Sequence, residues 1–350
     1  MDGLNPAEKK HIPKFAIIIA VTHSIKCLED CLKSLDNLDY AKEFFHVVLT
    51  DCHVLPGLKS FIDEKVSLYG CQISTISLPE QPSKHKAWLH EARLNEARNT
   101  AMQKVPAQYF VFTEDDCMFE PDWLTKFDPV LQDDIGAVGG PDLLQEGMGW
   151  LPKSLDCILN SFLGTAGKKK GEGLKDDWYY PRKENTVIPA KVIKRIGNFP
   201  EDMIFGAEME MAKRIRDAGL QIKYLPDNPV WHWRYTTYVN FLRRNIFHAN
   251  EKVRLLRRQQ AFIGSPHFIV FWVAVAGLAL GLFGLANNIA RMTFLILALF
   301  YLVLVLLIAA SSLVRSRSPA VGLGVILLLP SHHATIIMGV MKGVTSKIKV

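Results

Sequence analysis

The fold is decided by one stretch, Tyr109-Phe110-Val111-Phe112-Thr113-Glu114-Asp115-Asp116, which runs from apolar residues straight into three carboxylates. Its first half has the composition of a buried strand, and Pro121-Asp122-Trp123 follows as a signal for a turn into a helix. Adjacent carboxylates repel one another, so a strand end that carries three of them needs a compensating charge. A divalent cation bound by oxygen ligands supplies that charge. The alternative is an acidic turn that is simply solvated.

Strand and helix patterns alternate before this stretch. The continuous apolar run of residues 15–21 is typical of a strand buried on both faces, and residues 46–50 and 72–78 are predicted as further strands. Helical spacing of apolar residues lies between them, at 28–35 and 57–68, and another helix is predicted at 87–105. This alternation predicts an α/β domain with a doubly wound, mostly parallel sheet.

Three candidate site segments come directly after three different predicted strands: Thr22, Asp51 and the Glu114–Asp116 cluster. Ligands of doubly wound sheets bind at the carboxyl ends of the strands. We therefore expect these segments to converge on one edge of the sheet. The helix at 87–105 carries Arg93 and Arg98, which cannot share a face, so at most one of them points at the site.

Two later segments belong to the same predicted domain. Residues 164–177 are rich in Gly and Lys and are predicted to form a loop, either solvated and disordered or acting as a substrate lid. Residues 206–219 have helical spacing that ends at Gly219. Glu208 and Glu210 lie in its first turn, where they suit the helix dipole.

The charge distribution and the cysteine pattern indicate where in the cell the protein lies and what it binds. The net charge of +6 is concentrated in residues 243–258, which hold six Lys or Arg and one acid. A basic segment directly before an apolar one indicates a membrane surface rather than nucleic acid. The six cysteines have no zinc-site spacing, and the polar first fourteen residues contain no signal-peptide core. We therefore expect the polar domain to be cytoplasmic.

The end of the chain has three apolar segments. Residues 268–290 and 292–314 each contain 23 uncharged residues, enough to cross a membrane. Residues 319–341 are also uncharged but are interrupted by Pro330 and the polar residues that follow it. The linker Arg315-Ser316-Arg317 is expected to be cytoplasmic. We predict two spans, and a third segment that is re-entrant or interfacial or, alternatively, a third span.

An ordered set of motifs within residues 15–235 resembles family 2 glycosyltransferases. The set comprises Leu28–Leu35 of the form Leu-x-x-Cys-Leu-x-Ser-Leu, Ala97-Arg98-Asn99, a DXD-type motif at Glu114-Asp115-Asp116, Gly139-Gly140-Pro141, Gly206–Met211 and Val230–Arg234. The resemblance implies a GT-A nucleotide-sugar-binding fold (Rossmann-like) followed by a C-terminal α-helical transmembrane region. The predicted parts are a tail (1–14), the GT-A domain (15–235), a basic amphipathic segment (236–265), the apolar region (266–341) and a C-terminal tail (342–350).

The resemblance also implies roles in an inverting, metal-dependent transfer. Asp116 and Glu114 would hold Mn²⁺ or Mg²⁺ on the donor diphosphate. His232, between two Trp, is a third metal ligand, a contact to the leaving phosphate, or a packed histidine. Glu208 aligns with the catalytic base. The family more often has Asp at the positions of Glu114 and Glu208, so both arms are one methylene longer here.

Donor binding is assigned by the same resemblance. The predicted donor-binding residues are Thr22, Asp51, Arg98, Asp115, Arg243 and Arg244. Asp51 would contact the base of a UDP- or GDP-type donor, and Asp115 the ribose or donor sugar. Because a Gln-x-x-Arg-Trp motif is missing and few spans are predicted, a processive polymer synthase is disfavoured.

The function implied is transfer of a sugar to a lipid-linked or polyprenyl-phosphate acceptor at the cytoplasmic membrane face, for polysaccharide or glycoconjugate synthesis. Two alternatives stay open. A nucleotidyltransferase would need a Gly-rich basic loop, which residues 20–26 do not offer. A catalytically inactive membrane scaffold with the same fold would bind a partner without turnover.

Overall fold

The computed structural model describes residues 12–53, 55–79, 89–165, 179–234, 236–258 and 266–346. These residues form two units. An α/β unit contains residues 12–143 and 179–233, and a helical unit contains residues 144–165 and those described from Arg234 onward. Part of the predicted 15–235 domain therefore clusters with the C-terminal helices. Most of the predicted Gly- and Lys-rich loop lies outside the described residues.

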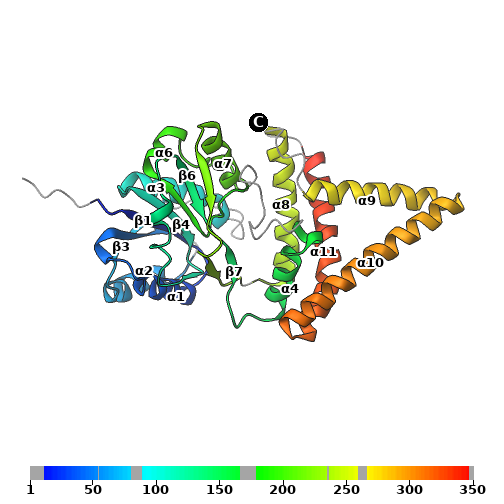
Figure 1. The fold of residues 1–350 in the computed structure, drawn as a ribbon, viewed down its shortest axis with the longest axis horizontal. Coiled ribbons are helices and arrows are strands. Elements are labelled where there is room, and N and C mark those ends of the chain that lie inside the picture. Colours follow the sequence, from blue (N-terminus) through cyan, green and yellow to red (C-terminus); the bar gives the residue numbers. More distant parts are fainter. Residues whose placement is uncertain are drawn as a thin grey trace, which may run out of the picture. The chain divides into compact units, whose positions relative to one another are not determined.

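The α/β unit is built on a seven-stranded sheet in the order β3-β2-β1-β4-β8-β6-β9. Figure 1 labels β3, β1, β4 and β6 of this sheet. The strands are β1 (Phe15–Val21), β2 (Phe45–Asp51), β3 (Gln72–Ser77), β4 (Tyr109–Glu114), β6 (Ile135–Gly139), β8 (Thr186–Pro189) and β9 (Gln221–Tyr224). Neighbouring strands are parallel except at β8, which is antiparallel to β4 and β6. The predicted α/β class with a mostly parallel sheet is confirmed.

Helices cover both faces of this sheet, and this explains the continuous apolar run in β1. Phe15, Ile17 and Ile19 pack on one face with α1 (Ile25–Asp36), whereas Ile18 packs on the other with α6 (Ala190–Ile196) and α7 (Ala207–Asp217). Each fully buried Ile stabilises the fold by about 1.5–3 kcal/mol. The remaining helices are α2 (Leu58–Lys65), α3 (Leu89–Lys104) and the short 3₁₀ turns Lys42–Phe44, Val66–Leu68 and Asp128–Val130.

A second, three-stranded sheet lies beyond the acidic stretch, in the order β5-β10-β7. Its strands are β5 (Cys117–Phe119), β7 (Asp142–Leu144) and β10 (Val230–His232). β10 pairs antiparallel with β5, and the register places His232 opposite Cys117. This small sheet therefore brings the predicted third metal ligand next to the acidic cluster.

The helical unit consists of α4 (Trp150–Leu159), α5 (Phe162–Thr165), α8 (Tyr238–Arg258), α9 (Pro266–Phe283), α10 (Asn288–Ser316) and α11 (Pro319–Thr345). α8 and α11 run side by side (Figure 1). A Cβ at Gly339 of α11 would lie 2.4 Å from the backbone oxygen of Ile246, so glycine permits this close approach. α8 covers residues 238–258 of the predicted basic amphipathic segment, and its Phe241 and Val253 pack against α11.

Among the described residues, two helices are long and apolar enough to cross a membrane, α10 with 29 residues and α11 with 27. At 1.5 Å per residue each is about 40 Å long, against about 30 Å of hydrocarbon. α9 ends at Phe283, earlier than predicted, and Arg291 lies in the first turn of α10. α11 continues unbroken through Pro330, and whether this third apolar segment spans the membrane or is re-entrant or interfacial stays a prediction.

Candidate active site

The predicted convergence of strand ends is present in the structure. Val21 of β1 is in register with Asp51 of β2, and Ala20 is in register with Glu114 of β4. The residues that follow these strands therefore share the carboxyl edge of the sheet, where α/β folds bind ligands. The acidic cluster forms the central part of this edge, because β4 is next to β1.

Asp115 binds the backbone directly after β1. Its Oδ2 accepts hydrogen bonds from the backbone nitrogens of Thr22 (3.0 Å) and His23 (2.9 Å), and its side chain is fully buried. Its Oδ2 thus fixes the backbone that follows β1, and the contact of Asp115 with the ribose or donor sugar stays a prediction. Thr22 lies at the predicted strand end, and its contact with the donor stays a prediction.

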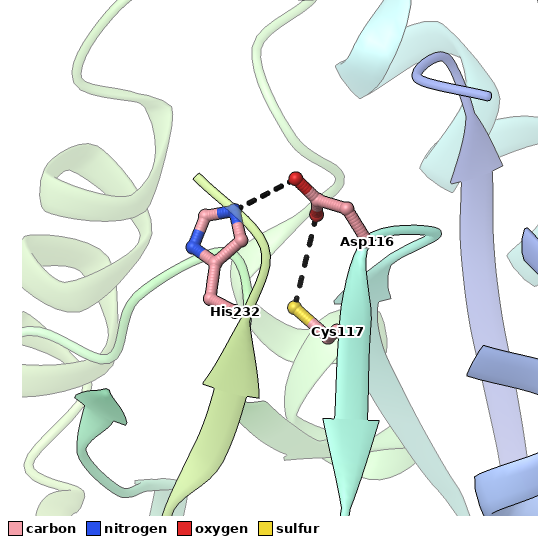
Figure 2. A group of neighbouring side chains, drawn as sticks. All are labelled: Asp116, Cys117 and His232. Atoms are coloured by element: carbon pink, nitrogen blue, oxygen red, sulfur yellow. Dashed lines mark hydrogen bonds and ion pairs between the residues drawn. The ribbon is translucent and has the colours of Figure 1, made fainter. Parts of the chain in front are cut away.

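Asp116, in the turn just before β5, faces His232 at the end of β10 (Figure 2). His232 Nε2 lies 2.9 Å from Asp116 Oδ2, and its Nδ1 lies 3.1 Å from Asp142 Oδ1. Burial opposes protonation of His232, but Asp116 and Asp142 outweigh it and raise its pKa to about 10. Cys117 lies beside Asp116, and burial keeps its pKa well above the usual range, so it remains a thiol.

Glu114 forms an ion pair with Lys183, a residue of the segment that leads into β8. Burial disfavours the charged form of Glu114, but Lys183, His23 and His232 outweigh burial and hold its pKa below the usual range. Glu114 is thus a carboxylate with a protein cation already beside it. Glu114 can bind a metal only if Lys183 moves away from its carboxylate.

His23 touches two carboxylates of the cluster. Its Nδ1 lies 2.7 Å from Asp115 Oδ1, and its Nε2 lies 3.4 Å from Asp116 Oδ2. Burial opposes protonation, but Asp116 and Asp115 raise the pKa of His23 to about 9. Lys183 and the two imidazolium groups of His23 and His232 therefore supply three positive charges beside the three adjacent carboxylates.

The donor set fits a divalent cation at Asp116. This residue belongs to two candidate groups among the described residues, one with Cys117 and His232 and one with His23 and Glu114. The 2.9 Å between His232 Nε2 and Asp116 Oδ2 is close to the edge of about 3.0 Å expected for two adjacent ligands of an octahedral ion. Carboxylate and imidazole ligands suit Mn²⁺. The predicted ligands Asp116 and His232 thus fit one ion.

The protonated histidines predict how metal binding depends on pH. Folding raises both pKa values, to about 9 for His23 and about 10 for His232. Their protonation therefore stabilises the metal-free fold fully below about pH 6.5, and this stabilisation is lost as pH rises towards those values. A metal must displace the proton of its ligand.

We therefore expect the increase in melting temperature caused by saturating Mn²⁺ to grow between about pH 6.5 and about pH 8.5. Differential scanning fluorimetry with and without Mn²⁺ measures this increase. The variant His232→Gln is the control and is expected to lose most of the pH dependence. A Mn²⁺ effect that is constant over this range would contradict the assignment.

Glu208 lies near the start of α7, with Arg98 of α3 beside it. Arg98 Nη1 donates to Glu208 Oε1 at 2.8 Å, and Nη2 donates to the carbonyl oxygen of Lys183 at 3.5 Å. Arg98 is 2% exposed. Its guanidinium is buried against protein groups, and the contact of Arg98 with the donor stays a prediction.

The other predicted donor contacts have different surroundings. Asp51 Oδ1 accepts a hydrogen bond from the backbone nitrogen of His53 at 2.7 Å, and His53 has φ of 58°. Asp51 stands at the same sheet edge as the acidic cluster, and its contact with the nucleotide base stays a prediction. Arg243 and Arg244 are exposed on α8 in the helical unit, and their donor contact also stays a prediction.

Sequence reasoning missed His23, Asp142 and Lys183. His23 directly follows Thr22, and Asp142 directly follows the Gly139-Gly140-Pro141 turn, so both had a motif as a signal. Lys183 had none, because it reaches Glu114 only through the position of the segment before β8.

Comparisons with known proteins agree with the geometry. No family model matches the chain. Glycosyltransferase AglE of Haloferax volcanii is 20% identical over 218 residues, which make up 62% of this chain and 66% of AglE. The match thus spans just under two thirds of that relative.

Two solved structures were compared with the chain. Mannosyltransferase PcManGT from Pyrobaculum calidifontis, solved in complex with GDP-Man and Mn²⁺, has a TM-score of 0.63 and 17% identity over 97% of this chain and 89% of its own. Residues 1–349 of S. aureus TarS match with a TM-score of 0.44 and 17% identity over 68% and 65% of the two chains. The PcManGT match shows that this chain has a glycosyltransferase fold.

Proposed function

We propose that this chain is a membrane-anchored, inverting, metal-dependent family 2 glycosyltransferase. It transfers a sugar from a UDP- or GDP-type nucleotide sugar to a lipid-linked or polyprenyl-phosphate acceptor at the cytoplasmic membrane face, feeding polysaccharide or glycoconjugate synthesis. The observation that carries the proposal is the pairing of Asp116 with His232 at the strand end, together with Glu208. PcManGT, which has the same fold, was solved with GDP-Man and Mn²⁺.

The residues divide the work of a single displacement. Asp116 and His232 would hold the cation, which neutralises the diphosphate as it leaves. The oxygen of the acceptor hydroxyl forms a bond to the anomeric carbon while the bond from that carbon to the diphosphate breaks. Glu208 takes the proton of the hydroxyl in the same step. Attack opposite the leaving group inverts that carbon. A polyprenyl phosphate is already anionic and needs little help from a base.

Membrane anchoring is supported by α10 and α11, which are long and apolar enough to span a bilayer. The basic linker Arg315-Ser316-Arg317 between them supports a cytoplasmic location for that end. A topology assay with reporters at the C-terminus and within this linker tests the orientation.

A thermal-shift screen of the purified full chain tests the proposal. UDP, GDP and their sugars are each added with Mn²⁺ or Mg²⁺, and one nucleotide class is expected to raise the melting temperature only when metal is present. The same donor is then tested for metal-dependent release of nucleoside diphosphate. Binding without release, or no binding at all, would favour an inactive scaffold instead.

Asp142 provides a separate prediction about the metal. A carboxylate on the second nitrogen of a metal-binding histidine fixes the ring, and its loss typically lowers metal affinity about 10- to 100-fold. We expect Asp142→Ala to weaken Mn²⁺ binding by this amount, measured by isothermal titration calorimetry. Asp134→Ala, which removes an exposed carboxylate bonded to Gln221, is the control. Equal Mn²⁺ affinity in both variants would refute the role of Asp142.

A further inference from the structure

We infer that Arg98 is a positioning residue that holds Glu208 in place for the proton transfer. The inference rests on the proposed function, since Glu208 accepts a proton only if the chain transfers sugars. Sequence resemblance assigns Arg98 to the donor, but the structure places it beneath the candidate base, with Nη1 at 2.8 Å from Glu208 Oε1. With Oε1 held in this way, we assign the accepted proton to Oε2.

Arg98 is itself rigidly held. Its side chain is 2% exposed, and its guanidinium carbon lies 4.9 Å from the ring centroid of Phe199 and 5.5 Å from that of Phe112. Cations over aromatic rings are attracted by the ring electrons, most strongly where water is excluded. The guanidinium is a planar fork with little freedom once clamped. It therefore presents a fixed point of attachment to Glu208.

The same helix also holds the chain that leads into α7. Asn99 exchanges two hydrogen bonds with the backbone of Phe199, at 2.9 and 3.0 Å. Asn95, one turn earlier on α3, donates to the carbonyl oxygen of Met203 at 2.8 Å. Thus α3 fixes both the backbone before Glu208 and its carboxylate.

This arrangement explains why the base needs a partner. A glutamate side chain has three rotatable bonds, so it spreads over many positions unless something holds its carboxylate. A displacement of about 1 Å from the productive geometry costs about 100-fold in rate. Arg98 acts on the rate through Glu208, and it leaves the affinity for the nucleotide unchanged.

The test uses Arg98→Met and Arg98→Lys in the full chain, each alone and combined with Glu208→Gln. Turnover is measured as Mn²⁺-dependent hydrolysis of GDP-mannose and UDP-N-acetylglucosamine, with water as the acceptor. Affinity for GDP and UDP is measured by calorimetry with Mn²⁺. The control is Arg93→Met, which is equally buried on α3 but donates to Glu96 and to backbone carbonyls.

We expect Arg98→Met to slow turnover about 100-fold with unchanged nucleotide affinity, and to slow the Glu208→Gln variant no further. Arg98→Lys should restore part of the rate, and Arg93→Met should lower the melting temperature without changing turnover. If Arg98→Met does not fold, Arg98→Lys provides the same comparison.

Two results would overturn the inference while leaving the proposed function standing. One is a loss of nucleotide affinity in Arg98→Met that matches its loss of turnover, which would return Arg98 to the donor. The other is a double variant that is slower than Glu208→Gln alone. A wild-type chain that binds no nucleotide and hydrolyses no donor would instead overturn the proposed function, and the inference with it.

Discussion

Asp116→Asn removes nucleotide-sugar turnover. We expect a loss of at least about 1,000-fold, because the cation that neutralises the leaving diphosphate depends on this carboxylate. A thousandfold loss corresponds to about 4 kcal/mol of transition-state stabilisation, which is within what a bound divalent ion supplies. Asn has nearly the same shape as Asp, so the change removes the charge and leaves the packing around a side chain that is 2% exposed.

The measurement is Mn²⁺-dependent release of nucleoside diphosphate, together with the Mn²⁺ affinity of the variant. Asp122→Asn is the matched control, since Asp122 lies six residues along the chain and pairs at the surface with Lys126. We expect the control to keep wild-type turnover. Near-normal Mn²⁺ affinity and turnover in Asp116→Asn would mean that the acidic strand end is a structural cluster, neutralised by Lys183, His23 and His232.

The sheet and its strand-end site were predictable because their signals are local. The apolar run of β1 shows that both faces of the strand are buried, and β4 ends in carboxylates at the residue where its pairing with β1 stops. In a parallel sheet, strands that end in polar residues place them on the same edge. The convergence of Thr22, Asp51 and Glu114 therefore followed from the strand assignments alone.

The residue patterns alone did not predict the partners within the site, because these depend on pairings between distant segments; His232 was placed at the metal only by the family resemblance. His232 reaches Asp116 only because β10 pairs with β5, and these residues are 116 positions apart. Lys183 reaches Glu114 from a segment with no motif of its own. A sequence pattern shows that a residue can ionise. Which oppositely charged neighbour pairs with it is determined by the tertiary structure.

Arg98 shows a different limit. Its motif indicates that the residue matters, and the family resemblance assigns it to the donor, yet the structure gives it a protein partner. α8 is a similar case, since its amphipathic pattern predicts an apolar face but not that α11 covers it. A sequence pattern identifies which helix face or residue makes a contact. The partner in that contact depends on the fold of the whole chain.

Glu208→Gln is expected to lower turnover about 100- to 10,000-fold, the range that a positioned general base contributes. Gln has the shape of Glu and still accepts a hydrogen bond from Arg98, so the geometry of the first turn of α7 is kept. The amide cannot take the proton of the acceptor hydroxyl. Nucleotide affinity and Mn²⁺ affinity should therefore stay unchanged while turnover falls, which separates this variant from Asp116→Asn.

The matched control is Glu210→Gln, because Glu210 lies in the same first turn and pairs with Arg214 at 2.8 Å. The comparison also discriminates between acceptors. A sugar hydroxyl must lose its proton as it attacks, so its transfer should depend fully on Glu208. A polyprenyl phosphate already carries the negative charge, so its transfer should survive the change. Near-normal turnover of Glu208→Gln with both hydroxyl and phosphate acceptors would exclude Glu208 as the base and leave its pairing with Arg98 as a purely structural ion pair.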